Sequence, residues 1–147
     1  MQSVIDDFRR TIDTAYDRLL QFDEAASAEP LAPGKWSRKE LLGHLIDSAS
    51  NNHQRFIRGQ LDESHAFPGY EQNSWVERNG YRDQSWSDLV ALWRSYNRHL
   101  LHVLARLPEA KLNTSCTVGN SEPMTLGFIA EDYVAHLQHH LEQFFAG

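Results

Sequence analysis

The sequence predicts an all-α fold, a single four-helix bundle domain over residues 1–147, and three observations predict it. Four long segments carry apolar residues at three- and four-residue steps, which is the period of an amphipathic helix. The 147 residues suit one compact domain. The sequence holds no internal repeat or low-complexity tract, so a bundle whose facing helices can build a site inside the core is the simplest architecture.

The first helix is expected from Ser3, as its N-cap, to about Phe22. Residues 25–36 contain two prolines and a glycine, which favour a connection. Ser37 and Glu40 form an S-x-x-E capping box for a second helix that continues to Gly59. The inward positions of this second helix are unusually polar.

Helical periodicity is lost between residues 60 and 84, which contain a proline, two glycines and several aromatic residues. We expect an ordered loop with short helical turns. Segments of this length without a long regular element often cover a binding site, so this one is a candidate lid. A third helix follows over residues 85–107 and stops at Pro108.

Residues 111–125 contain threonines and valine around the turn Gly119-Asn120, which indicates a short β-hairpin between helices three and four or, alternatively, a loop. Thr125 then caps a last helix that reaches the C-terminus.

Composition excludes several functional classes. The chain has 14 Lys and Arg against 20 Asp and Glu, a net charge of −6, and nucleic-acid binders usually show clustered basic residues instead. No run approaches the roughly 18 apolar residues that cross a bilayer, and residues 1–7 lack the layout of a secretory signal. We therefore expect a cytoplasmic protein with no nucleic-acid or membrane partner.

A single cysteine, Cys116, excludes an internal disulfide framework and a multi-thiolate zinc site. No base lies near it in the sequence, so it is interpreted as a structural or exposed thiol rather than a nucleophile.

The last helix contains the motif H-x-x-H-H. His136 and His140 are four residues apart and share one helical face, with Cβ atoms about 5 to 6 Å apart, close enough to converge on one ion. His139 lies one step aside from His140 but within about 60° of His136, so the pair His136 and His139 stays open.

Two histidines leave a transition metal under-coordinated, and the best third ligand is His44, which stands in an apolar run after Gly43. Gly43 allows close backbone approach. Asp47 could orient a ligand histidine or a water, while Ser48 and Asn51 share the face of His44 and could contact a ligand. Three neutral imidazoles would give a site charge near +2, which suits zinc or nickel.

The structural alternative is that these histidines are exposed or hydrogen-bonded groups without a metal. That interpretation is preferred for the remaining histidines: His53 and His65 are expected at the surface or in a loop, and His99 and His102 at the edge of helix three.

Three segments, residues 36–48, residues 70–75 and residues 136–140, together resemble the DinB/YfiT-like family of metal-dependent hydrolases. The resemblance implies a four-helix bundle with a metal pocket at one end, often in homodimers. Matched by position, it implies that His44, His136 and His140 bind a divalent ion and that His139 is not a usual ligand. Some members of the family catalyse thiol-dependent transfer.

Two functions follow from these residues. The first is a metal-dependent enzyme acting on a small molecule, either a hydrolase or a transferase that uses a low-molecular-weight thiol as cosubstrate. Asp47 or Glu131 could serve as the base of a hydrolase. The second is a non-catalytic bundle that binds a small ligand or a partner, with a structural or vestigial metal site.

Overall fold

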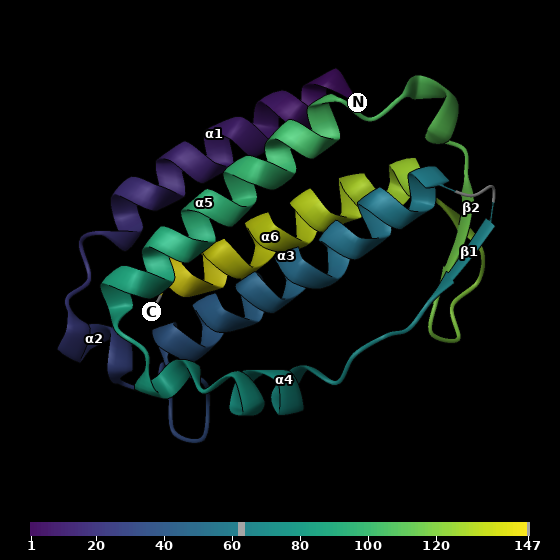
Figure 1. Cartoon of the computed structure of the whole chain (residues 1–147). Coiled ribbons are helices and arrows are strands. Elements are labelled where there is room, and N and C mark those ends of the chain that lie inside the picture. The colour runs from purple at the N-terminus through teal and green to yellow at the C-terminus, as the bar shows by residue number, and fades with distance from the viewer. Residues whose placement is uncertain (62–63, 147) are drawn as a thin grey trace.

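The computed structural model describes residues 1–61 and 64–146 and confirms the four-helix bundle (Figure 1). The four long helices are α1 (Gln2–Leu19), α3 (Arg38–Leu61), α5 (Trp86–Ala105) and α6 (Leu126–Ala146). α1 packs against α5 and α6, and α3 packs against the same two helices from the other side. The apolar faces of all four helices meet in one core.

The helix directions explain the long irregular segment between α3 and α5. In Figure 1 these two helices run in the same direction, from the end with α2 toward the end with the sheet. The chain must therefore return along the whole bundle before α5 can start. α3 has 24 residues, so this return covers about 36 Å at 1.5 Å per residue.

The segment between α3 and α5, called the crossover below, contains β1 (Ser64–Phe67), α4 (Gln72–Asn79) and the 3-10 turn η1 (Tyr81–Asp83). The expected ordered loop with short helical turns is thus confirmed for its described part, and residues 62 and 63 lie outside the described residues. The strand β1 was not predicted, because its partner lies far away in the sequence.

The predicted hairpin is confirmed. β2 (Ser115–Val118) pairs antiparallel with β3 (Met124–Thr125), after the 3-10 turn η2 (Glu109–Lys111). β1 adds a third strand, parallel to β2, with Phe67 opposite Val118. The sheet lies at the end of the bundle away from the C-terminus of the chain (Figure 1).

One expectation for the N-terminal third is wrong, and one element there was missed. Ser3 does not cap the first helix, since α1 already begins at Gln2 and no side chain caps it. The connection after α1 also contains a short helix, α2 (Glu24–Ala28), whose cap Asp23 accepts a hydrogen bond from the Ala26 amide at 2.7 Å. Sequence periodicity missed α2 because it has only five residues.

The other helix starts agree with the sequence. The Ser37 hydroxyl accepts from the Glu40 amide at 3.2 Å, and the Glu40 carboxylate accepts from the Ser37 amide at 3.1 Å, which is the predicted reciprocal capping box. Thr125 accepts from the Phe128 amide at 3.0 Å at the start of α6. These caps fix the starts of α3 and α6, the two helices that carry the histidine motifs.

Gly43 allows the crossover to pack directly on α3. A Cβ at this position would lie 2.0 Å from a ring carbon of Tyr81. We therefore expect Gly43→Ala to destabilise the protein by about 2 kcal/mol, even though alanine gains up to about 1 kcal/mol in helix propensity. Chemical denaturation measures the effect.

Gly59→Ala is the matched control on the same helix, because its Cβ would meet only the flexible end of Leu126 at 2.9 Å. If the two variants had equal stability, the close packing of Tyr81 on Gly43 would be contradicted.

Candidate metal centre

Three histidines from two helices converge at one end of the bundle. His44 lies in the second turn of α3, and His136 and His140 lie in the second half of α6. One ring nitrogen of each lies within 4.8 Å of the other two, and the Nε2 atoms of His136 and His140 are 3.0 Å apart. The antiparallel packing of α3 on α6 thus joins residues that are about ninety positions apart in the sequence (Figure 1).

His44 is the most constrained member of this cluster. Its side chain is fully buried, and neither ring nitrogen has a hydrogen-bond partner among the described residues. Burial, followed by the neighbouring His140 and His136, lowers its pKa to about 4. The imidazole is therefore neutral at physiological pH and keeps one nitrogen lone pair available.

His136 and His140 are half-buried, and burial is also the main cause that lowers their pKa values. Nδ1 of His140 lies 3.1 Å from Oε1 of Gln143. A protonated Nδ1 donates a hydrogen bond to this oxygen, which leaves the lone pair of Nε2 available for a metal ion. His139 is exposed and lies outside the cluster. The structure thus brings together His136 and His140 with His44, and not His139.

This set of donor atoms fits a divalent metal ion. A buried polar ring without a hydrogen bond is unfavourable unless another partner satisfies it. Three neutral imidazoles whose nitrogens converge can satisfy that need together by binding one ion, and this donor type suits zinc, nickel and copper. The cluster of His44, His136 and His140 could therefore hold such an ion.

Asp47 lies one turn after His44, and its carboxylate accepts hydrogen bonds from the crossover. Its Oδ1 accepts from the Tyr81 hydroxyl at 2.6 Å and from the side-chain amide of Asn79 at 3.0 Å. Its Oδ2 is buried with no partner in residues 1–61 and 64–146. Asp47 thus joins the crossover to α3 and makes no hydrogen bond to a histidine of the described residues, while its expected role in orienting a water stays a prediction.

A cavity of about 350 Å³ extends from His136 toward the sheet. The crossover supplies Tyr70 and Gln72 to its wall, so this segment does cover part of the cavity, while its opening as a lid stays a prediction. The other lining residues come from α3, α6 and the hairpin region: Ser48, Asn52, Arg55, Val118, Ser121, Met124, Ile129, Asp132 and Tyr133.

Ser48 and Asn51, both predicted to contact a ligand, differ in their positions. Ser48 lines the cavity that reaches His136. Asn51 donates to the backbone oxygen of Asp47 at 2.9 Å and lines a neighbouring cavity instead. Sequence reasoning missed Arg55 and Tyr70, although Arg55 follows Ser48 by seven residues and therefore shares its helical face.

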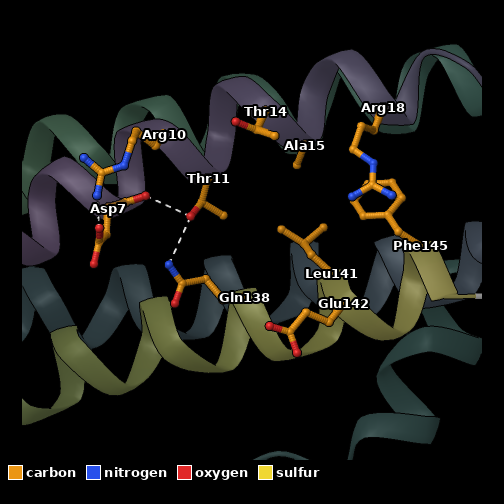
Figure 2. Close-up of a pocket in the computed structure, with 10 residues that line it drawn as sticks. All are labelled: Asp7, Arg10, Thr11, Thr14, Ala15, Arg18, Gln138, Leu141, Glu142 and Phe145. Atoms are coloured by element: carbon orange, nitrogen blue, oxygen red, sulfur yellow. Dashed lines mark hydrogen bonds and ion pairs between the residues drawn. The ribbon is translucent and has the colours of Figure 1, made fainter.

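A larger surface pocket of about 470 Å³ lies between α1 and α6 (Figure 2). The Gln138 amide donates to the Thr11 hydroxyl at 3.1 Å across it, and Arg18 lies over the Phe145 ring. Gln138 follows His136 by two residues, about 200° around the helix. This pocket therefore lies on the opposite face of α6 from the histidine cluster.

The remaining histidines, Glu131 and Cys116 lie outside the three-histidine cluster. Nδ1 of His53 lies 2.9 Å from the Tyr96 hydroxyl, and the ring of half-buried His65 stacks on Phe67 in β1. His99, His102 and Glu131 are exposed. Cys116 is buried in β2, and burial raises the pKa of its thiol, which agrees with a structural role.

Comparison with known proteins identifies the family. The model of the DinB superfamily matches residues 7–144. The chain belongs to the DinB superfamily. This match covers almost the whole chain and includes all three histidines of the cluster.

One relative of this DinB-superfamily protein is similar over most of its length. OB0413 of Oceanobacillus iheyensis, which carries the name "Putative metal-dependent hydrolase", is 24% identical over 144 residues, with 93% of this chain and 81% of that protein covered.

Two solved structures share the fold. YfiT from Bacillus subtilis, described as a probable metal-dependent hydrolase with an unusual four-helix bundle topology, matches with a TM-score of 0.86 at 20% identity, covering 97% of this chain and 82% of YfiT. A mycothiol-dependent maleylpyruvate isomerase matches with a TM-score of 0.78 at 13% identity, covering 98% of this chain and 60% of the isomerase.

No helix in the described part of this DinB-superfamily protein is both long and apolar enough to span a bilayer.

Asp47 gives the stability of the metal-free protein a specific pH dependence. Burial raises the pKa of Asp47 to about 6, against an ordinary value of 3.8, even though the Tyr81 hydrogen bond acts to lower it. The folded state therefore binds this proton more tightly, and the resulting stabilisation grows as pH falls from 6 to 4. We expect Asp47→Asn to lose this gain, so its stability relative to wild type should fall by about 2 to 3 kcal/mol between pH 7 and pH 4.

Urea denaturation in EDTA at both pH values measures this difference. His44, whose lowered pKa acts in the opposite direction, is present in both proteins and cancels. A stability difference that does not change with pH would show that Asp47 is not held in this buried environment.

Proposed function

We propose that this protein is a metal-dependent enzyme that acts on a small molecule, with His44, His136 and His140 as the ligands of a divalent zinc or nickel ion. The observation that carries this proposal is the fully buried imidazole of His44, which lacks a hydrogen bond to any described residue and faces two more imidazoles. Family membership and the metal-dependent hydrolase names of two relatives support it.

The surroundings of the cluster suit catalysis better than a purely structural metal site. Three protein ligands leave positions for water or substrate, as catalytic zinc sites do. A bound ion would lower the pKa of a water, for hydrolysis, or of a low-molecular-weight thiol, for transfer. The adjoining cavity of about 350 Å³ has room for a small substrate.

Residues of the chain would orient the substrate and handle protons. Ser48 and Tyr70 line the cavity, and their hydroxyls can donate hydrogen bonds to a substrate or accept them from it. Asp132 also lines this cavity, and its negative charge acts to raise the pKa of His136. Asp132 is therefore a candidate proton acceptor beside the cluster. Asp47 keeps the crossover in place through Tyr81 and Asn79.

A substrate screen separates the possible reactions. Zinc- and nickel-loaded protein is incubated with panels of esters, amides and electrophiles, with and without glutathione, mycothiol or bacillithiol, and His136→Ala is the blank. Turnover that requires a thiol supports transfer, and turnover without one supports hydrolysis. Metal-loaded protein that turns over no substrate of either panel would overturn the enzymatic proposal in favour of a ligand-binding bundle.

We also propose that the protein forms a homodimer and acts in the cytoplasm, as the resemblance and the sequence composition led us to expect. Analytical ultracentrifugation at several concentrations tests the first point, and a monomer throughout would contradict it.

A further inference from the structure

Arg55 stands out in the cavity beside the histidine cluster because it has no acidic partner. Its guanidinium makes two long hydrogen bonds, to Oδ1 of Asn52 at 3.3 Å and to the backbone oxygen of Pro68 at 3.4 Å. It forms no ion pair within the described part of the chain. Of its five N–H donors, most are therefore left for a ligand.

Arg55 lines both the cavity beside His136 and its neighbour, and the charges of the first cavity bear on its role. Arg55 is the only Lys or Arg among the described residues that line the first cavity, and the one carboxylate, Asp132, is on α6 with His136. Arg55 is half-buried, and lost hydration lowers its pKa, so pairing with an anion would be favourable there. A single guanidinium offers one fork of N–H donors and one positive charge, which matches a singly charged carboxylate better than a doubly charged phosphate monoester.

We propose that Arg55 binds a carboxylate group of the small-molecule substrate whose reacting end lies at the three-histidine cluster. This inference rests on the proposed function, since it assumes that the substrate reacts at the three-histidine cluster. It adds a substrate class, a monocarboxylate, and a residue that determines specificity.

The position of Arg55 sets the length of such a substrate. Arg55 follows His44 by eleven residues, but its hydrogen bond to Asn52 brings the guanidinium back to a level about eight residues beyond His44. At 1.5 Å per residue this is about 12 Å. A metal–sulfur distance of about 2.3 Å and an arginine hydrogen bond of about 2.8 Å leave roughly 7 Å between the sulfur and the carboxylate oxygen of the molecule. Because the carbon–sulfur bond and the carboxylate take up part of this length, roughly three to four methylene groups span it.

Two pairs of thiol probes test this length. Co²⁺ replaces the native ion, and binding of a thiolate is followed by its sulfur-to-cobalt charge-transfer absorption. The long pair is 5-mercaptopentanoic acid and 5-mercaptopentan-1-ol, and the short pair is 3-mercaptopropionic acid and 3-mercaptopropan-1-ol. We expect the long acid to bind on the order of tenfold more tightly than the long alcohol, and the short acid to show no such preference.

Two substitutions assign the preference to one side chain. Arg55→Gln should remove the preference of the protein for the long acid, and Arg55→Lys should keep only part of it, because lysine lacks the planar fork. Arg58→Gln is the matched control: Arg58 lies one turn further along α3, lines the neighbouring cavity and carries the same charge. It should leave the preference unchanged.

The outcomes separate the two proposals. Failure to bind Co²⁺ overturns the proposed function itself. Co²⁺ binding with equal affinity for the long acid and the long alcohol overturns only the role of Arg55, as does an Arg58→Gln effect equal to that of Arg55→Gln. The wild-type comparison of the long pair decides the question even if Arg55→Gln does not fold.

Discussion

His136→Ala should lower the affinity for zinc by about 100-fold or more, while His139→Ala, three positions along the same helix, should leave it nearly unchanged. Removing groups that merely orient a metal ligand typically lowers metal affinity 10- to 100-fold, so losing a direct ligand should reach at least the upper end of that range. The exposed His139 takes no part in the cluster. Competition titration with a chromophoric chelator measures both affinities.

This pair of variants is well matched. Both remove one imidazole from the same stretch of α6, so general effects on charge and helix propensity are similar. Circular dichroism should show wild-type helix content for both. Equal losses of affinity in the two variants would mean that the motif binds metal through a different pair of histidines.

The second large effect is that zinc should reverse which of wild type and His44→Leu is the more stable protein. In EDTA, His44→Leu should be more stable than wild type by about 1 to 3 kcal/mol, because an apolar side chain of similar size replaces a buried ring without hydrogen bonds. With zinc at 1,000 times its dissociation constant, wild type should gain about 4 kcal/mol and His44→Leu very little.

Urea denaturation with and without zinc measures both values. His53→Leu is the control, because His53 is hydrogen-bonded to Tyr96 and lies outside the cluster. It should lose stability in EDTA and keep the full response to zinc. If His44→Leu, like the control, were less stable than wild type in EDTA, the imidazole of His44 would have a hydrogen-bond partner in the metal-free folded protein.

Local sequence signals were sufficient for the long helices and for the members of the cluster. The capping box at Ser37 and the cap at Thr125 act within three residues, and the four-residue spacing of His136 and His140 is a property of any helix. His44 was recognisable as a buried polar residue because apolar residues surround it in the sequence.

Features that depend on distant contacts could not be predicted in the same way. β1 forms a strand because it meets β2, and α2 is stabilised by the ion pair between its Glu24 and Lys39 of α3. The role of Arg55 depends on a cavity whose walls come from the crossover, the hairpin and α6. The parallel direction of α3 and α5, which forces the crossover along the bundle, is likewise a property of the whole fold (Figure 1).

The position of the metal is tested most directly by anomalous diffraction from crystals of the untagged, zinc-loaded protein. Our account predicts one strong peak per chain at the zinc edge, about 2.0 to 2.1 Å from a ring nitrogen of each of His44, His136 and His140. A zinc peak at another place in the chain, or the absence of a peak between α3 and α6, would contradict it.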